Sequence, residues 1–350
     1  MIRHGFLLSM ITPVFALACG FATAQENTDY SQSSTWRFEF ANDLVSDSDN
    51  QFTNGVSLQK HGPLALSLDE TGGTAAIGKR LARFFLPDSE GLYYREAWSF
   101  GQNMQSPDEI ENPDIILNDL PYMGMMGWHN SFIAFDDQSL TGFGWMIGVV
   151  GENSFAEEAQ EFVHKLTDAE EPEGWEHQLD NEPILSLFYT KKKKLWRKSN
   201  FDGAVSFNAA VSNFVSYGEV GLEMRFGRMP EGFAYVPDPI GRGLSYHAEL
   251  PAKDESLFYG TLIVRGTGFL VDMLREGNTF VDDNEWTENN ILEPKDFKSQ
   301  VFVGIHYERR KWALRFNFWY GSDSVETDVL PLEQDPENSG GTITYEWRFD

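Results

Sequence analysis

Hydrophobic and polar side chains alternate with a period of two along several stretches of this chain. Between residues 36 and 40, aromatic side chains at every second position alternate with Arg37 and Glu39. The same pattern recurs at 220–227, 301–307, 312–320 and 343–349. Because successive side chains of a strand point to opposite faces, each stretch predicts a strand with two different faces.

A coarse reading of the whole chain predicts twelve such strands. They are expected at 36–42, 53–61, 94–103, 121–135, 141–150, 182–190, 201–213, 217–227, 257–272, 297–308, 311–321 and 341–349. Most are of the length that crosses a bilayer in a β-barrel, and no stretch after the first 24 residues holds 18 consecutive apolar residues. We therefore predict an all-β fold, a transmembrane antiparallel barrel of about twelve strands. A soluble β-sandwich is the alternative that alternation also allows.

The beginning of the chain has the composition of a secretory signal. Arg3 and His4 precede an apolar stretch at about 6–18, and Ala22-Thr23-Ala24 provides a small-residue cleavage site. We expect 1–24 to be a signal peptide and 25–350 to form the barrel, in the outer membrane of a Gram-negative bacterium. Acylation of Cys19 is disfavoured, because Ala16 stands three residues before it. Without Cys19, the only cysteine, the mature chain can form no disulfide.

The chain carries a formal charge of -27 at pH 7. Nucleic-acid binding requires positive charge, so a nucleic-acid partner is not expected. An acidic surface next to a polyanionic membrane would require divalent cations between the two.

In an antiparallel barrel the odd-numbered strands run one way and the even-numbered strands the other, so successive connections alternate between two rims. We call this alternation strand parity. With a periplasmic N-terminus, the outer rim receives 43–52, 104–120, 151–181, 273–296 and 322–340, whereas 136–140, 191–200 and 308–310 become short inner turns. On this interpretation the lysines at 191–194 lie in a solvated turn. The long segments 62–93 and 228–256 also fall on the inner side, which parity does not explain.

Two polar groups on the predicted outer rim could carry chemistry. Residues 42–54 concentrate carboxylates and amides where one strand ends and the next begins. In the 151–181 segment, Ser154 and Glu157 have the spacing of a capping box, which predicts a helix from 154 to about 166. Gln160 and His164 are separated by four residues, so they share one face of that helix.

Several motifs occur in an order that resembles a known family. They are Asn42-Asp43, Phe52-Thr53-Asn54-Gly55, Gly101-Gln102-Asn103-Met104, Asn118-Asp119-Leu120-Pro121-Tyr122, Gln160 with His164, and Gly174-Trp175 with Gln178 and Glu182. This set resembles the outer-membrane lipid A 3'-O-deacylases of the LpxR family over about 36–321. The resemblance implies a twelve-stranded barrel with an outer-loop helix that hydrolyses an acyl ester of lipid A with Ca²⁺.

The residue chemistry is compatible with that activity. His164 can act as a general base on water, and oxygen atoms of Asp43 and Asn42 can bind a hard cation such as Ca²⁺. Thr53 and Gln160 are further candidates for the catalytic site. The other motif positions are Gln102, Asp119, Tyr122, Trp175, Gln178 and Glu182. We expect a monomer whose partners are lipid A or lipopolysaccharide and the outer membrane.

Other functions remain open at this stage. A calcium-dependent phospholipase barrel would also hydrolyse acyl esters, and a non-catalytic barrel could bind lipopolysaccharide or conduct solutes. A conducting barrel predicts a wide polar lumen, whereas an enzyme predicts a packed one. We expect the five histidines His61, His129, His177, His247 and His306 to be ordinary surface or rim residues.

Overall fold

The computed structural model describes residues 34–42, 54–72, 76–167, 169–238, 251, 254–326 and 338–349. The expected signal peptide and the site candidates Asp43 and Thr53 lie outside these residues.

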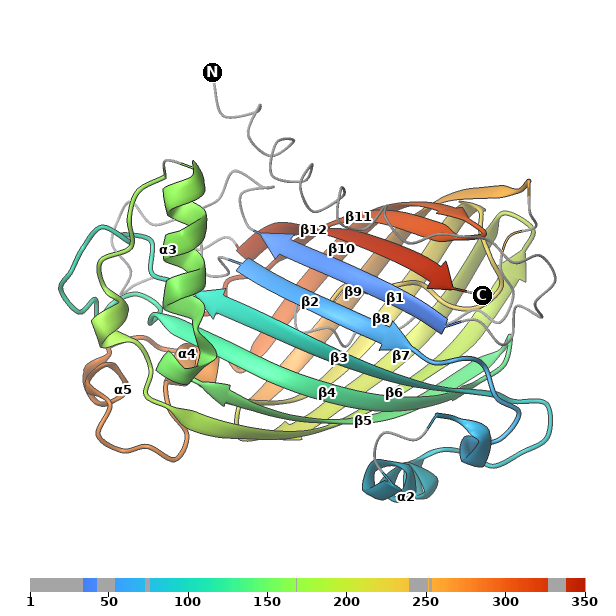
Figure 1. Ribbon diagram of the computed structural model, residues 1–350, viewed down its shortest axis with the longest axis horizontal. Coiled ribbons are helices and arrows are strands. Elements are labelled where there is room, and N and C mark those ends of the chain that lie inside the picture. Colours follow the sequence, from blue (N-terminus) through green and yellow to red (C-terminus); the bar gives the residue numbers. More distant parts are fainter. Residues whose placement is uncertain are drawn as a thin grey trace.

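Twelve antiparallel strands form one closed barrel (Figure 1). The strands are β1 (Ser34–Asn42), β2 (Asn54–His61), β3 (Tyr93–Gln105), β4 (Met123–Phe135), β5 (Ser139–Val150), β6 (Glu182–Lys198), β7 (Phe201–Ser212), β8 (Val215–Arg228), β9 (Ser256–Asp272), β10 (Phe297–Arg309), β11 (Trp312–Gly321) and β12 (Asn338–Phe349). Closure occurs between β1 and β12, where Ser34 pairs with Phe349 and Asn42 with Gly341. The predicted barrel is thereby confirmed.

The two rims of the barrel differ in the length of their connections. The inner rim, where Ser34 and Phe349 lie, has the short turns 136–138, 199–200 and 310–311. The outer rim carries the long segments 106–122, 151–181 and 273–296. Their helices are η5 (Glu152–Ser154), α3 (Ala156–Thr167), η6 (Trp175–His177), α4 (Met273–Glu276) and α5 (Glu285–Asn289). Three of the five inner connections are short turns, as is usual on the periplasmic side of an outer-membrane barrel, whereas the connections after β2 and β8 are long.

Along the parts of the chain that are described, no helix is long and apolar enough to cross a membrane.

Strand register gives the wall a polar inner face and an apolar outer face. Arg37 is buried in the lumen, where its guanidinium lies 2.8 Å from the carboxylate of Glu346. On β10 the side chains of Val301, Val303 and Ile305 are exposed on the outside. The alternation in the sequence therefore separates a charged lumen from a lipid-facing surface.

The lysine-rich stretch is a strand and not the solvated turn that parity suggested. β6 continues to Lys198, and Lys192 and Lys194 point into the lumen. Their ammonium groups lie 2.7 Å from Glu223 and 2.8 Å from Asp202. A run of charges can continue as a strand because every second residue finds a counter-charge inside the barrel.

The expectation for the histidines was also partly wrong. His61, His129 and His306 are buried in the lumen, and Nε2 of His306 lies 3.0 Å from Oγ1 of Thr261. His177 lies in η6 at the outer rim, and His247 lies outside the described residues. A lumenal histidine is hidden from solvent yet surrounded by polar groups, so its sequence neighbours resemble those of a surface residue.

Residues 229–238, which we call the plug, fill part of the lumen from the inner rim. The hydroxyl of Tyr235 donates to the carboxylate of Glu39, and the amide of Asp238 donates to the same carboxylate at 2.8 Å. The carbonyl of Gly232 accepts from Nη2 of Arg225 at 2.8 Å. The long 228–256 segment therefore falls on the inner side because its first part enters the barrel. The plug thus fills part of the lumen among the residues that the structure describes.

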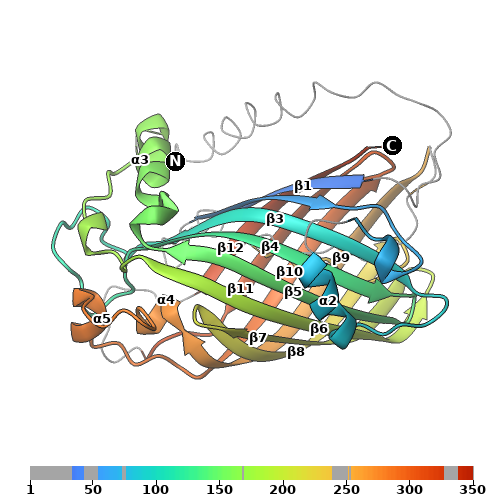
Figure 2. The ribbon, with the colours of Figure 1, turned by 60° about the horizontal axis from the view of Figure 1, so that its bottom comes forward.

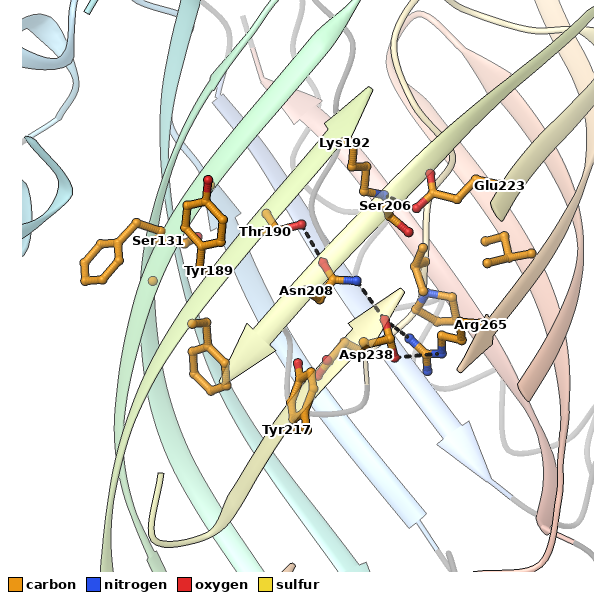
Figure 3. Close-up of a pocket in the computed structure, with 18 of the residues that line it drawn as sticks. Ser131, Tyr189, Thr190, Lys192, Ser206, Asn208, Tyr217, Glu223, Asp238 and Arg265 are labelled. Atoms are coloured by element: carbon orange, nitrogen blue, oxygen red, sulfur yellow. Dashed lines mark hydrogen bonds and ion pairs between the residues drawn. The ribbon is translucent and has the colours of Figure 1, made fainter. Parts of the chain in front are cut away.

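A small pocket of about 110 Å³ remains between the plug and the wall (Figure 3). Asp238 from the plug, and Asn208 and Arg265 from the wall, line this pocket, and the amide of Asn208 donates to Glu219 at 2.7 Å. A second cavity of about 230 Å³ lies on the lumen side of the wall, lined among others by Gln105, Pro237 and Phe302.

The other long inner segment, 62–92, folds onto the outside of the wall. It contains η4 (Leu68–Glu70) and α2 (Ala76–Phe85), and α2 lies beside the end of the barrel opposite α3 (Figures 1 and 2). Phe132 of β4 and Phe143 of β5, both on the outward face, are buried in the apolar cluster that includes Ala82 of α2. The two inner segments thus cover opposite faces of the same wall.

Candidate active site

Helix α3 begins directly against the outer end of β4. The amide of Gly151, whose φ is 96°, donates to the carbonyl of Gly124 at 2.9 Å. A Cβ at Gly124 would overlap the side chains of Ser154 and Ala156, so glycine allows this close approach. The start of the helix is thereby fixed to the barrel wall.

The predicted capping box does not form. A 3₁₀ turn ends at Ser154, Phe155 adopts a left-handed conformation with φ of 57°, and α3 begins only at Ala156. The hydroxyl of Ser154 is buried without a hydrogen-bond partner among the described residues. The chain is turned by Phe155 instead, because the close contact with Gly124 orients Ser154 toward the wall.

The buried part of α3 is held by an aromatic pair. Nε1 of Trp175 donates to Oε1 of Gln160 at 2.7 Å, and both side chains are almost completely buried. The ring of Tyr122 packs on Trp175 with centroids 4.9 Å apart, and its hydroxyl donates to the carbonyl of Ile110 at 2.9 Å. Burial raises the pKa of Tyr122 to about 12, so its hydroxyl remains protonated at neutral pH. The structure therefore joins three of the sequence candidates, Tyr122, Gln160 and Trp175, in one cluster.

Two further candidates, Gln102 and Asp119, form hydrogen bonds with backbone groups of the loops around this cluster. Nε2 of Gln102 on β3 donates to the carbonyl of Ser154 at 2.7 Å, at the start of the α3 segment. The carboxylate of Asp119 accepts from the amides of Asp108 at 2.8 Å and Leu120 at 2.7 Å. Both side chains hold backbone groups in place, Gln102 beneath α3 and Asp119 within the 106–122 segment.

Glu182 connects several outer-rim segments. Its Oε2 accepts from the amides of Thr279 and Phe280, each at 3.0 Å, and its Oε1 accepts from the side chain of Asn213 at 2.8 Å. Gln178 takes part through its backbone, since its carbonyl accepts from the side-chain amide of Asn284 at 3.1 Å. Four hydrogen-bonding connections thus tie the start of β6 and η6 to the neighbouring loops.

His164 lies one turn beyond Gln160, where α3 has left the buried cluster. Its Nδ1 lies against the carbonyl oxygen of Glu170, which can only accept a hydrogen bond. This contact assigns the proton to Nδ1 and the lone pair to Nε2. Phe162 and Leu166, next to this turn, are each 63% exposed. The far end of α3 therefore presents a possible base beside an apolar surface.

Asn42 lies at the outer end of β1. It is buried and pairs with Asn54 on β2 and Gly341 on β12. Its amide oxygen is a hard donor of the kind that Ca²⁺ binds, and the chain continues directly into Asp43. Within the described ranges, no group of three or more His, Cys, Asp or Glu side chains could hold a metal ion.

A family model described as outer membrane protein LpxR matches residues 8–349. The chain belongs to the LpxR family.

One solved structure supports the same barrel fold. LpxR from Salmonella typhimurium has a TM-score of 0.69 and 13% sequence identity, and the match covers 89% of this chain and 99% of that one. The beta domain of the Bordetella autotransporter BrkA is less similar, with a TM-score of 0.42, 7% identity, and coverage of 91% and 99%. The curated proteins gave no match. At these identities the structural likeness describes the barrel fold.

In this LpxR-family barrel, the 273–296 segment contributes contacts that the sequence did not reveal. Nε1 of Trp286 donates to the carbonyls of Ile116 at 3.0 Å and Asp119 at 3.2 Å. Nδ2 of Asn278 donates to the carbonyl of Asp180 at 3.0 Å. The triplet Gly277-Asn278-Thr279 was a visible signal, but it did not indicate which loops these residues would join.

Proposed function

We propose that this protein removes the 3'-linked acyl chain or chains of lipid A at the outer surface of the outer membrane. The observation that carries this proposal is the position of His164 on α3, one turn beyond the buried Gln160–Trp175 contact, in an LpxR-family barrel. A helix fixed at one end and exposed at the other can place a base over the rim without blocking a large lipid.

The chain's own residues can perform ester hydrolysis in two proton transfers. Nε2 of His164 accepts a proton from water while the water oxygen forms a bond to the acyl carbonyl carbon. When the bond between that carbon and the sugar oxygen breaks, His164 returns the proton to the sugar oxygen. The carbonyl of Glu170 orients the imidazole through Nδ1. Gln160, bonded to Trp175, fixes the turn of helix from which His164 projects.

Asn42 and Asp43 would hold Ca²⁺ at the other side of the site, with Thr53 as a further donor. A bound Ca²⁺ supplies stabilisation of negative charge on the carbonyl oxygen. The amide oxygen of Asn42, at the outer end of β1, is a ligand of the type that Ca²⁺ binds, which supports this part of the proposal.

Apolar surface near α3 suits the acyl chains of the substrate. Phe162 and Leu166 are exposed on the helix. Ile147 and Leu185 are opposite each other on β5 and β6, and both are exposed on the outer wall. Lipid A in the outer leaflet would meet this surface while its headgroup remains at the rim. We infer further that a signal peptide at 1–24 directs export and that the enzyme acts as a monomer.

Mass spectrometry of lipid A after incubation with the refolded barrel tests this function. The wild type is compared with His164→Ala, each with Ca²⁺ or with chelator, and phospholipids are analysed in parallel. Loss of a 3'-linked acyl chain that requires both Ca²⁺ and His164 is the expected result.

The control is Lys165→Ala, because Nζ of Lys165 points to Glu161 at 2.8 Å on the surface of the same helix. Folding of each variant is verified by heat-modifiable mobility. Unchanged lipid A with a folded barrel would contradict the proposal, and release of fatty acid from phospholipids alone would assign a phospholipase instead.

A further inference from the structure

A polar patch interrupts the outer wall near the inner rim. Strand register places Glu96 of β3 and Asn130 of β4 on the outward face, and Nδ2 of Asn130 donates to Oε1 of Glu96 at 3.0 Å. Both are buried in the folded chain. Exposed to hydrocarbon, a carboxylate and an amide would be strongly unfavourable. The 62–92 segment removes this patch from contact with lipid.

One face of α2 packs closely over this part of the wall. A Cβ at Gly78 would lie 2.6 Å from Nε1 of Trp145 and 3.1 Å from Oδ1 of Asn130, so glycine is needed there. The ring of Phe85 stacks on Phe143 with centroids 4.6 Å apart and planes inclined by 2°. α2 is therefore a fixed part of the outer surface.

A second face of α2 is apolar and uncovered. Ile77, Leu81 and Phe84 are spaced as neighbours on one side of a helix, and Phe84 is 83% exposed. Leu66, in the same segment, is also exposed. In the figures α2 lies outside the strands and not under the barrel opening (Figures 1 and 2). The uncovered face therefore continues the apolar outer surface of the wall.

The third face of α2 is basic in a chain of formal charge -27. The helix contains Lys79, Arg80 and Arg83 and no acidic residue. Nζ of Lys79 donates to the carbonyl of Thr71 at 2.7 Å, and Arg83 pairs with Asp69. Arg80 is exposed at the boundary between the basic and apolar faces. This local positive charge is complementary to phosphate groups.

We propose that α2 is an interfacial anchor that inserts Ile77, Leu81 and Phe84 into the periplasmic leaflet of the membrane, with Arg80 beside the headgroup of an anionic phospholipid. An amphipathic helix with basic and apolar faces lies in the plane of such an interface. Its position at the inner rim puts it at the periplasmic leaflet, on the opposite side of the membrane from α3. The anchor holds the cover over Glu96 and Asn130 in the membrane-bound protein.

Site-specific fluorescence in lipid vesicles tests the anchor. In a Cys19→Ser background, which removes the only native cysteine, Phe84→Cys is labelled with an environment-sensitive dye and the chain is folded into vesicles. Glu90→Cys, exposed in the same segment, is the matched control. The label at 84 should emit at shorter wavelength and be quenched several-fold more by brominated lipids than the label at 90. Equal quenching of both labels by aqueous iodide would overturn the proposal.

A charge variant tests the phosphate contact separately. Vesicles contain phosphatidylcholine with or without phosphatidylglycerol, and the lipid quenching of the label at 84 is compared before and after Arg80→Gln. A basic residue near an anionic surface changes membrane partition by about fivefold, so the variant should reduce quenching only when phosphatidylglycerol is present. Equal quenching with and without Arg80 in phosphatidylglycerol vesicles would exclude a headgroup contact. If the apolar face of α2 instead serves to bind another periplasmic protein, it stays outside the lipid in these vesicles, which lack that protein, and iodide quenches both labels equally.

Discussion

Helices α2 and α3 lie at opposite ends of the same barrel and are attached to it in different ways. α2 packs along the wall through Gly78 and Ala82, and its remaining apolar face continues the outer surface. α3 is attached mainly at its beginning, where Ala156 and Gln160 are buried, and its last turn with His164 lies in a more open setting.

This difference shows how one wall supports two kinds of helix. Lateral packing along the whole of α2 suits an element that must cover polar groups of the wall. Attachment at one end suits α3, because a lipid substrate needs space around the base. The comparison predicts that substitutions on α3 affect turnover without loss of the barrel, whereas substitutions under α2 affect the stability of the barrel itself.

The largest effect is expected from His164→Ala. Removal of a general base lowers turnover by roughly 10²–10⁴-fold, and the barrel should remain folded because the imidazole lies outside the Gln160–Trp175 cluster. Deacylation rates at saturating Ca²⁺ measure this effect, with Lys165→Ala as the control. A rate within a few-fold of wild type would show that the open end of α3 does not provide the base.

A large side chain under α2 should lower stability instead of turnover. Gly78→Leu forces atoms into the space held by Trp145 and Asn130, and such overpacking costs about 1–3 kcal/mol. Gly218→Leu is the matched control, because a Cβ at Gly218 meets nothing within 4 Å. Urea unfolding of the two variants in vesicles compares the costs. Equal costs at 78 and 218 would mean that the contact of α2 with the wall contributes little.

The strands of the barrel could be predicted from the sequence, because their pattern depends on one rule, the alternation of lipid-facing and lumen-facing side chains. Alternation gave twelve strands because a wall between lipid and a polar lumen repeats every two residues. The rule failed for Lys192 and Lys194, since a charge that finds a partner across the lumen has the same sequence pattern as a charge in water. The plug escaped prediction because its contacts, such as Tyr235 with Glu39, join residues far apart in the chain.

The candidate site was predictable only in part, for a similar reason. The spacing of Gln160 and His164 correctly placed both on one helix, and the helix exists. Local sequence could not show that Trp175 would bury Gln160 or that Glu182 would hold three connections together, because those contacts form between loops. The roles of Asp43, Thr53 and Ca²⁺ stay predictions.

Removal of the Trp175 indole N–H tests how strongly the first half of α3, which contains Gln160, is attached to the barrel. Trp175→Phe keeps the ring packing on Tyr122 but leaves the buried Oε1 of Gln160 without its donor, which costs about 1–3 kcal/mol. Amides of α3 should then exchange hydrogen faster, while those of the strands should not. Trp312→Phe, at the inner rim, provides the control. Unchanged exchange in α3 would indicate that the helix is held by other contacts.

The smallest effect concerns the pH dependence of α3. Partial burial, followed by the nearby charges of Glu161, Glu158 and Glu152, raises the pKa of Glu157 above its ordinary value of 4.5. A raised carboxyl pKa means that the folded helix binds the proton more tightly than the unfolded chain. Its ionisation therefore opposes folding at neutral pH, and this cost disappears as the pH falls through the raised value toward 4.5. Because Glu157 is only partly buried, solvent screening limits the cost to about a few tenths of a kcal/mol.

Glu157→Gln should remove that pH dependence. Hydrogen exchange of the α3 amides, corrected for the intrinsic effect of pH, should become slower in the wild type as the pH is lowered from 7 to about 4, below the ordinary pKa of a glutamate, and stay constant in the variant. At pH 7 the variant should be slightly the more protected of the two. The α2 amides serve as the internal reference, because α2 contains no carboxylate. If the wild type and Glu157→Gln responded to pH in the same way, the ionisation of Glu157 would not contribute to the stability of α3.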